Sequence, residues 1–464
     1  MGVFSEDLWR GWCLAVLVAA TVGSLTVSRA AVAQAKAPGL SPLQSATQDA
    51  IFVACPPLAQ QGLFNQNGTL LGRFAASCTQ MVLNSTAVQS GGGNRTALGI
   101  QYETISPTQA NAQKPGQIEA ISARLLDLRA GARGFLLSQN GVPVGDPRGV
   151  AVAGPTSPEG TGGAAGADSD FGGRWGGFMN ISYNGGTVDE TGNQTGYNFN
   201  NWGILAGADY RITDAFVLGG ALGYSYTKSN YDFGLGSVKA STISGTLYGT
   251  YYVDRWYLDG SLSYGSVGYD TVRNFTLPAS PAVGGIPAFV QRSATATASP
   301  DGNQWSASIS AGYNYAMDSY LITPFVRLGY IEVRNDSFQE DEPINGMGLA
   351  IDARTVRSLQ SGLGARLSRA FSTAKGVVTP YFTAQWMHEF ENSNSSITAK
   401  FVNDPANNFF FVPTDQPTRD YAIFAVGVQG QFQNGASAFL QLSTTAWLDN
   451  INVYSAIAGV RISF

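Results

Sequence analysis

From Phe171 to the C-terminal Phe464, apolar residues alternate with small or polar residues in one stretch after another. Within Ala215–Thr227 the bulky side chains share one parity and the small ones the other: Phe216, Leu218, Leu222, Tyr224 and Tyr226 against Gly219, Ala221, Gly223, Ser225 and Thr227. Because successive side chains of a strand point to opposite faces, each stretch predicts a strand with one apolar and one small or polar face. A soluble β-sandwich could alternate as well, so alternation alone does not decide.

The position of the aromatic residues favours a membrane barrel over a sandwich. Aromatic residues stand near the ends of the predicted strands rather than at their centres: Trp175, Trp202, Trp256, Trp386, Trp447 and the pair Tyr251 and Tyr252. Transmembrane barrels carry such aromatic girdles, and a tilted strand needs about 9–11 residues to cross the bilayer. About twelve stretches are long enough. We therefore predict an all-β transmembrane barrel of 12 antiparallel, up-and-down strands, with both barrel ends on one side.

Composition supports this class and excludes others. Charged residues make up 13% of the chain, and outside the first thirty residues no apolar run is long enough for a membrane-spanning helix. The net charge of −5 argues against a nucleic-acid partner. Outer-membrane lipid is the partner that such a barrel requires.

The N-terminus has the features of a secretory signal. Arg10 precedes the apolar segment Cys13–Val22, and Ala31-Val32-Ala33 provides a cleavage site. We expect residues 1–33 to be removed after export, which places the protein in the outer membrane of a Gram-negative bacterium.

Residues 34–137 predict a small α-helical, disulfide-linked module. Pro42–Ala54 and Leu70–Leu83 have helical spacing, and Pro56-Pro57 is expected to end the first helix. In an oxidising periplasm, Cys55 and Cys78 predict a disulfide rather than a metal pair. Such a module needs the bridge because its own core is small.

A third helix and a linker precede the barrel. The helix is predicted to start at Pro115 and stop at Gly134, and residues 138–170 are rich in Gly, Pro, Ala and Ser. Extended, this linker could reach about 100 Å, against a bilayer core of about 30 Å. The module could therefore lie outside, plug the pore or stay in the periplasm. We predict that the barrel comprises residues 171–464.

The connections between strands predict the orientation. Short turns are expected at Thr213-Asp214, Asp254-Arg255, Asp318-Ser319 and Asn434-Gly435, and long connections near 185–198, 229–238, 271–304, 335–352 and 391–418. Outer-membrane barrels place short turns in the periplasm and long loops outside. The first strand and Phe464 should then have their ends in the periplasm. Asp449–Ile451 is the exception, because it should be external but is tight.

Eight charged residues occupy polar positions of the alternating stretches, and we predict that they line the pore. They are Arg174, Asp209, Arg211, Asp259, Arg327, Arg366, Glu389 and Arg461. They could be an ordinary solvated lining. Alternatively, some could pair with a segment inside the pore, the candidates being Arg124, Asp127, Arg129 and Arg133 of the third helix.

Several motifs occur in an order that resembles one family. They are the runs Trp202–Arg211, Leu218–Tyr224, Leu363–Leu367, Trp386–Phe390 and Gly459–Phe464. Together they resemble the translocator domain of the autotransporters of type V secretion. The resemblance implies a 12-stranded barrel whose pore holds a segment leading to an N-terminal passenger.

The resemblance also implies partners, and the chain departs from the family pattern in its passenger. Phe464 resembles the C-terminal signal read by the barrel assembly machinery, with periplasmic chaperones as further partners. The passenger is short and has no glycine-rich β-helix repeat, and Asn200-Asn201 and Asn407-Asn408 do not stand at a cleavage junction before the barrel. We therefore expect an uncleaved monomer that displays a helical passenger.

Enzymatic function is not expected. A Ser-His-Asp triad needs a histidine, and the chain's one histidine, His388, lies inside a predicted barrel strand. We predict no catalytic residue, cofactor or metal. The alternative function is a non-secreting, passive or structural channel with a periplasmic or pore-plugging module. The sequence predicts no particular host or cell-surface ligand for the passenger.

Overall fold

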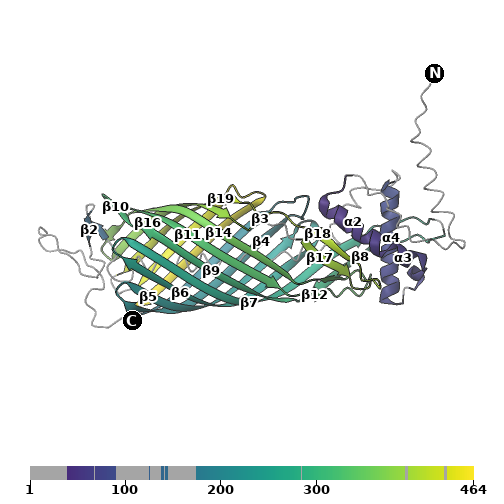
Figure 1. Cartoon of the computed structure of the whole chain (residues 1–464), viewed down its shortest axis with the longest axis horizontal. Coiled ribbons are helices and arrows are strands. Elements are labelled where there is room, and N and C mark those ends of the chain that lie inside the picture. The colour runs from purple at the N-terminus through teal and green to yellow at the C-terminus, as the bar shows by residue number, and fades with distance from the viewer. Residues whose placement is uncertain are drawn as a thin grey trace, which may run out of the picture.

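The computed structural model describes residues 39–66, 68–89, 125, 137–139, 142–144, 174–283, 285–391, 396–432 and 436–463. Its main body is a closed antiparallel barrel of 12 strands, with helices beyond one end (Figure 1). The barrel strands are β3 Trp175–Val188, β4 Tyr197–Thr213, β5 Phe216–Tyr231, β6 Gly236–Val253, β7 Trp256–Leu277, β9 Asp301–Tyr313, β11 Tyr320–Asn335, β14 Arg354–Ser368, β16 Gly376–Glu389, β19 Asp420–Phe432, β20 Ser437–Ala446 and β21 Ile451–Ser463. The predicted fold class is confirmed.

Pairing of the last strand with the first closes the barrel. β21 pairs with β3 from Ile451 opposite Val188 to Ser463 opposite Gly176. Closure satisfies the backbone hydrogen bonds of both strands without leaving an edge in the lipid. The short strands β10 Tyr315–Met317 and β15 Phe371–Thr373 continue the wall beside β11 and β16.

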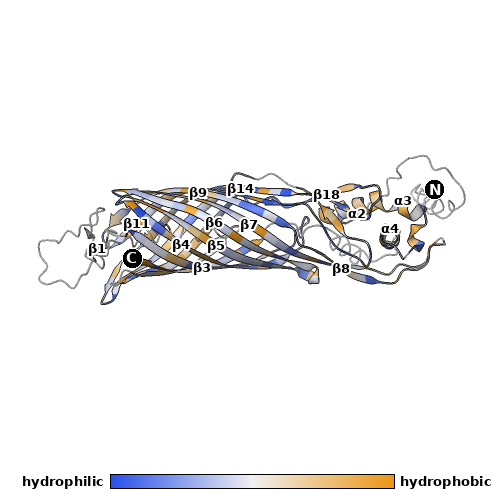
Figure 2. Cartoon of the chain, turned by 90° about the horizontal axis from the view of Figure 1, so that it is seen from below, coloured by the Kyte–Doolittle hydropathy of each residue, from blue (hydrophilic) through white to orange (hydrophobic). Residues whose placement is uncertain are grey.

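Side chains of the wall alternate between the lumen and the outer surface, as predicted. On β5, Val217 and Ala221 are buried whereas Leu218 and Leu222 are exposed on the lipid face. Figure 2 shows hydrophobic and hydrophilic residues alternating along the strands. The bulky parity therefore faces outward and the small or polar parity faces inward.

Most of the predicted aromatic girdle also faces outward. The exposed members are Trp175, Trp202, Trp256, Trp386, Trp447 and Tyr251. Tyr252 does not belong to the girdle: it packs against buried lumenal residues and accepts a hydrogen bond from Arg211 Nη1 at 2.9 Å. Neighbouring residues of a strand face opposite sides, so Tyr251 and Tyr252 cannot both point outward.

The two barrel ends differ in their connections. At the short-turn end, residues 214–215, 254–255, 318–319 and 374–375 connect successive strands, and Ser463 pairs with Gly176. The turn at 374–375 was not anticipated, and Asn434-Gly435 lies outside the described residues. Asp254 and Asp318 have φ of 51°, as tight hairpin turns require.

The opposite, long-loop end carries additional strands. β8 Arg292–Ala298 pairs with the projecting part of β7, and a separate four-stranded sheet has the order β12-β13-β17-β18. This loop sheet consists of β12 Phe338–Gln339, β13 Leu349–Ile351, β17 Ser396–Phe401 and β18 Phe409–Pro413. The expected long connection near 229–238 is wrong: β5 and β6 run on to Tyr231 and Gly236, and Asp232–Gly234 forms a single turn, η3, between them.

The helical module lies beyond the long-loop end (Figure 1). It comprises α2 Pro42–Ala54, α3 Pro56–Gln60, the 3₁₀ turn η1 Leu63–Asn65 and α4 Leu70–Gln89. Ser41 and Gln44 form a capping box that starts α2. Pro56 begins a further short helix, and α4 continues past the predicted end at Leu83. Among the described residues, no helix is long and apolar enough to cross a membrane.

Parts of the predicted organisation lie outside the described residues. These are the signal segment 1–33, the third helix apart from Leu125, and residues 138–170 apart from two short strands. The strands, β1 Leu137–Gln139 and β2 Val142–Val144, pair as a hairpin at the boundary between the predicted module and the predicted linker. Both views place this hairpin at the short-turn end (Figures 1 and 2).

Candidate functional site

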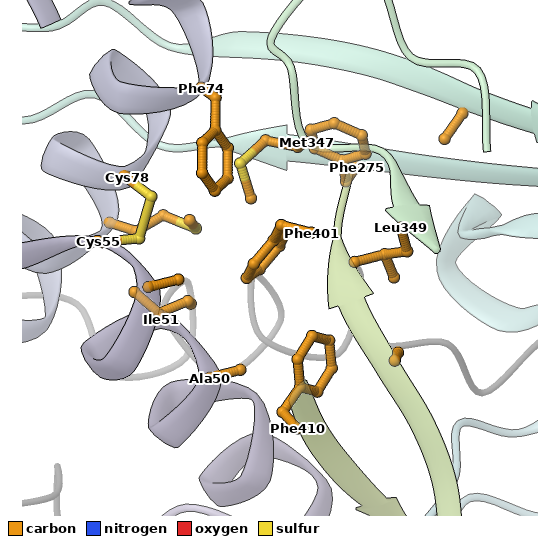
Figure 3. Close-up of a cluster of buried hydrophobic side chains, with 14 of the residues drawn as sticks. Ala50, Ile51, Cys55, Phe74, Cys78, Phe275, Met347, Leu349, Phe401 and Phe410 are labelled. Atoms are coloured by element: carbon orange, nitrogen blue, oxygen red, sulfur yellow. A yellow bond between two sulfur atoms is a disulfide. The ribbon is translucent and has the colours of Figure 1, made fainter. Parts of the chain in front are cut away.

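The hydrophobic core of the helical module is completed by residues from the long loops. Figure 3 shows Ile51 of α2 and Phe74 of α4 pointing toward Phe401 of β17 and Phe410 of β18. The ring centroids of Phe74 and Phe401 are 5.3 Å apart, and those of Phe401 and Phe410 are 5.5 Å apart. Further loop residues buried in this core are Phe275, Leu277, Ala294, Ala296, Met347, Leu349, Ile351, Ile397, Ala399 and Val412. Helices and loops thus share one core.

Sharing the core links the stability of the module to the loops. Fully burying one large apolar side chain stabilises a structure by about 1.5–3 kcal/mol. Separating the two parts would expose Phe74 and Met81 on the helices and Phe401 and Leu349 on the loops, all of which are buried. An exposed apolar surface of this kind is unfavourable in water, so the structure favours the docked module.

The disulfide lies within this core. Cys55 and Cys78 are joined, with Cα atoms 5.0 Å apart, and both are fully buried. The predicted pairing is confirmed. The bridge links the end of α2 to the middle of α4, which fixes the helix pair that presents Ile51 and Phe74 to the loops.

Polar contacts fix the orientation of α4 on the loops. Gln80 Nε2 donates to the carbonyl of Pro278 at 2.6 Å, and Arg292 Nη2 donates to Gln80 Oε1 at 2.8 Å. Ser77 Oγ donates to the carbonyl of Asn345 at 3.0 Å. Burial lowers the pKa of the Arg292 guanidinium, and the nearby Glu342 carboxylate opposes this shift. These directional bonds add specificity to the apolar contact.

The loop between β11 and β14 is braced by two buried carboxylates. Glu340 pairs with Arg273 of β7 and accepts from the Leu349 amide at 3.0 Å. Glu342 accepts from the amides of Asn345 and Met347 at 2.8 and 2.7 Å. Because charge-assisted hydrogen bonds are strong, they hold the loop in the shape that α4 contacts.

One glycine allows the closest approach of this loop to α4. Gly346 has φ of +72°, and a Cβ there would lie 2.7 Å from the carbonyl oxygen of Leu70 and 2.9 Å from the amide nitrogen of Phe74. Both the backbone conformation and the space therefore require glycine.

The lumen contains a residue from the segment between the module and the barrel. Leu125 is helical, 2% exposed, and packs with Phe178, Leu205, Val217 and Tyr248 of the barrel wall. Phe178 and Tyr248 meet edge to face, with centroids 5.8 Å apart. The predicted third helix thus contributes at least this residue to an apolar cluster inside the barrel.

Several predicted pore charges surround that cluster toward the short-turn end. Asp209 accepts from Tyr248 Oη at 3.1 Å, and both Asp209 and Arg461 lie against Gly176. Arg211 Nη1 donates to Tyr252 Oη at 2.9 Å. Asp259 is buried and accepts from Ser310 Oγ at 3.4 Å.

The remaining predicted pore charges are more dispersed. Arg366 is buried and lies over the Tyr381 ring, with the guanidinium carbon 3.5 Å from the centroid. Glu389 is buried and accepts from Ser358, Leu359 and Gln360.

Arg327 lines a lumenal cavity of about 560 Å³ toward the long-loop end, together with Glu389. Arg174 differs, because it precedes β3 at the short-turn end and is exposed, bonded to Tyr210. The proposed helix partners Arg124, Asp127, Arg129 and Arg133 lie outside the described residues, as does Phe464.

The single histidine lies on the outer face of the wall. His388 Nδ1 is 2.8 Å from Asp420 Oδ1, and its ring contacts Trp386 and Phe390. Ser361 of β14 is the partner of His388 in register, but no hydrogen bond joins these two side chains in the described part of the chain. Among the described residues, no group of three or more His, Cys, Asp or Glu residues is arranged to hold a metal.

The geometry defines an outer-membrane β-barrel whose lumen and long loops engage the N-terminal part of the same chain. A family model, the autotransporter β-domain, matches residues 177–443 of the 464-residue chain. The chain belongs to the autotransporter β-domain family, as the ordered motifs predicted.

Individual relatives match only in part. A protein of Pseudomonas putida, named as an uncharacterized protein in the trpE-trpG intergenic region, is 30% identical over 47% of this chain and 34% of its own length. Esterase EstA of Pseudomonas aeruginosa is 26% identical over 53% of this chain and 37% of its own length. The chain therefore spans about a third of the length of these relatives.

Among solved structures, the translocator domain of the autotransporter NalP from Neisseria meningitidis is similar. It is 17% identical, with a TM-score of 0.49, over 64% of this chain and 90% of that one.

Sequence reasoning missed the loop half of the shared core. Phe401, Phe410 and Val412 lie in a connection that was expected to be a long loop. The run Phe409–Val412 is unusually apolar for an exposed loop, and this was a usable signal.

Proposed function

We propose that this protein is an autotransporter that carries its own short helical module through the barrel and retains it as a cap on the long-loop end. The observation that carries the proposal is the shared core, in which Phe74 and Ile51 of the module are buried by Phe401 and Phe410 of the loops. The module is suited to remain on the loops because its own apolar surface is completed there.

The course of the chain supports passage through the lumen. α4 lies at the long-loop end, Leu125 lies inside the barrel, and the β1-β2 hairpin lies at the short-turn end, where β3 begins. Long loops face the exterior in outer-membrane barrels. In that orientation the module is displayed outside the cell while the connecting segment occupies the pore.

The relatives named as an esterase, a lipase and a serine protease do not change this proposal. This chain covers 37%, 39% and 24% of those proteins, so their activities remain statements about them. Because the chain's one histidine lies in strand β16 of the barrel and not in the helical module, we propose that the module acts through its surface rather than by catalysis.

Surface labelling of intact cells tests the proposal. A short epitope tag inserted at Gly68, an exposed site with open space before α4, should bind antibody on intact cells. The matched control is the same tag in the Asp254-Arg255 turn at the short-turn end, which should bind only after outer-membrane permeabilisation. If the Gly68 tag behaves like the control, surface display is wrong.

The alternative is a non-secreting barrel with a pore-plugging module. The position of Leu125 inside the lumen favours one part of that alternative, the plugged pore. The two functions differ in the labelling result, because a non-secreting barrel leaves the Gly68 tag inaccessible in intact cells.

A further inference from the structure

Two lysines stand directly opposite each other on the outer surface of the barrel. Lys228 of β5 and Lys239 of β6 are partners in register. Their strand neighbours, Ser229 after Lys228 and Val238 before Lys239, line a common pocket on the lumenal side. The lysines therefore point outward, where Lys239 is exposed and Lys228 half-buried. In the same row, Asn200 of β4 stands beside Lys228 and Asp270 of β7 beside Lys239.

The pair is not neutralised within the described part of the chain. Like charges that face each other across two strands destabilise the sheet. The row contains one carboxylate, that of Asp270, which already accepts a hydrogen bond from Ser299 Oγ at 3.0 Å. The row therefore carries two ammonium groups and one carboxylate, and an external anion would reduce the repulsion.

The position of the two lysines relative to the aromatic girdle indicates which anion they can reach. The next outward-facing pair on β4 and β5, two residues toward the short-turn end, is Trp202 and Tyr226, whose ring centroids are 6.3 Å apart. Aromatic rings of a girdle lie at the boundary between the hydrocarbon core and the headgroups. Lys228 follows Tyr226 by two residues, about 6–7 Å further out along the strand, at the level of lipid phosphates.

We propose that Lys228 and Lys239 bind a phosphate of the phosphorylated glycolipid in the outer leaflet, the lipid A phosphate. Two ammonium groups on adjacent strands match the charge of one phosphate, and the Asn200 amide in the same row can donate to its oxygens. The choice of lipid rests on the proposed function, because that orientation places the long-loop end in the outer leaflet.

Binding of defined lipids to the purified full chain tests this site. The delipidated protein in detergent is titrated with lipid A, dephosphorylated lipid A or phosphatidylglycerol and followed by native mass spectrometry. The variant is Lys228→Gln with Lys239→Gln. The control is Arg334→Gln, which removes an outward cation near the long-loop end that lies close to Glu332. Heat-dependent electrophoretic mobility verifies that each barrel is folded.

The double variant should bind lipid A about thirtyfold more weakly than the unaltered chain, since two basic contacts at the membrane surface are lost. Dephosphorylated lipid A should bind equally weakly to both, and Arg334→Gln should bind lipid A like the unaltered chain. Equal lipid A binding by the double variant, or an equal loss in Arg334→Gln, would overturn the proposal.

The result also separates this proposal from the proposed function. A surface-accessible Gly68 tag without lysine-dependent lipid A binding overturns the lipid site alone. Lysine-dependent binding of phosphatidylglycerol but not of lipid A, with an inaccessible tag, overturns both.

Discussion

At the scale of single residues, the contact between the barrel loops and α4 depends on one glycine. Gly346 and Gly234 both have a left-handed backbone, with φ of +72° and +69°, but only Gly346 lies against another element. Alanine at either position adds about 1–2 kcal/mol of backbone strain. Gly346→Ala adds a clash with Leu70 and Phe74 as well.

We therefore expect Gly346→Ala to increase the rate of proteolysis of the helical module in the purified full chain far more than Gly234→Ala does. Cleavage within residues 39–89 is followed by mass spectrometry. Equal rates for the two variants would mean that the loop does not hold α4.

The buried pair of Arg273 and Glu340 gives a second residue-scale prediction. Arg273→Met leaves the Glu340 carboxylate buried without its cation, and breaking a buried pair in this way costs about 3–5 kcal/mol. Adding Glu340→Gln removes the charge and keeps an acceptor for the Leu349 amide, so the double variant should be more stable than Arg273→Met alone.

Stability is measured as the temperature at which protease releases the module. The control, Arg357→Met, breaks an exposed pair with Glu332 and should cost less than about 1 kcal/mol. A double variant that is less stable than the single one would contradict the role of the buried charge.

At the scale of elements, the two faces of β18 should have different roles. Phe410 is 6% exposed within the shared core, whereas its neighbour Phe411 is 62% exposed on the other face. Phe410→Ala should lower the stability of the docked helical module by about 3–5 kcal/mol, as buried Phe-to-Ala changes do. Phe411→Ala should leave protease resistance of the module unchanged, and equal effects of both changes would contradict the shared core.

The disulfide is the second element-scale test. Replacing both Cys55 and Cys78 by Ala should destabilise the module by about 2–4 kcal/mol while the barrel keeps its folded electrophoretic mobility. Differential protease sensitivity of residues 39–89 and of the barrel measures this. Loss of barrel mobility in the same variant would show that the module is needed to fold the barrel.

The same elements show which parts of the fold can be predicted from the sequence. The alternation of Phe216–Tyr226 predicts both the strand and its lipid face, because the period of a strand is local. The helices around Cys55 and Cys78 follow from local spacing too. That Phe401 and Phe410 bury Phe74 does not follow, because a pattern of apolar residues identifies a buried face and not its distant partner.

The pore charges illustrate the same limit. Parity predicts that Asp209, Arg366 and Glu389 line the pore, and all three are buried in the structure. Parity cannot predict that Arg366 lies over Tyr381 or that Arg174 precedes the first residue of its strand. Leu125 has the spacing of a helical core residue, but only the closed barrel places it among Phe178 and Tyr248.

At the scale of the whole molecule, the N-terminal part of the chain contacts the barrel in two places. Leu125 fills part of the lumen and the helical module covers the long loops. A barrel of 12 strands is wider than the 8-stranded barrels whose interiors are filled by their own side chains. Removing residues 34–170 should therefore leave a conducting channel.

We expect the variant lacking residues 34–170 to show a larger single-channel conductance in planar bilayers, and greater antibiotic sensitivity in cells, than the full chain. The variant with Cys55 and Cys78 replaced by Ala keeps the lumenal segment and should stay poorly conducting. Arg366→Glu and Arg327→Glu test whether lumenal charges retain the segment, because charge reversal should then raise ion leakage. Unchanged leakage in these two variants would exclude charge pairing, and an unchanged conductance after deletion of residues 34–170 would exclude the plug itself.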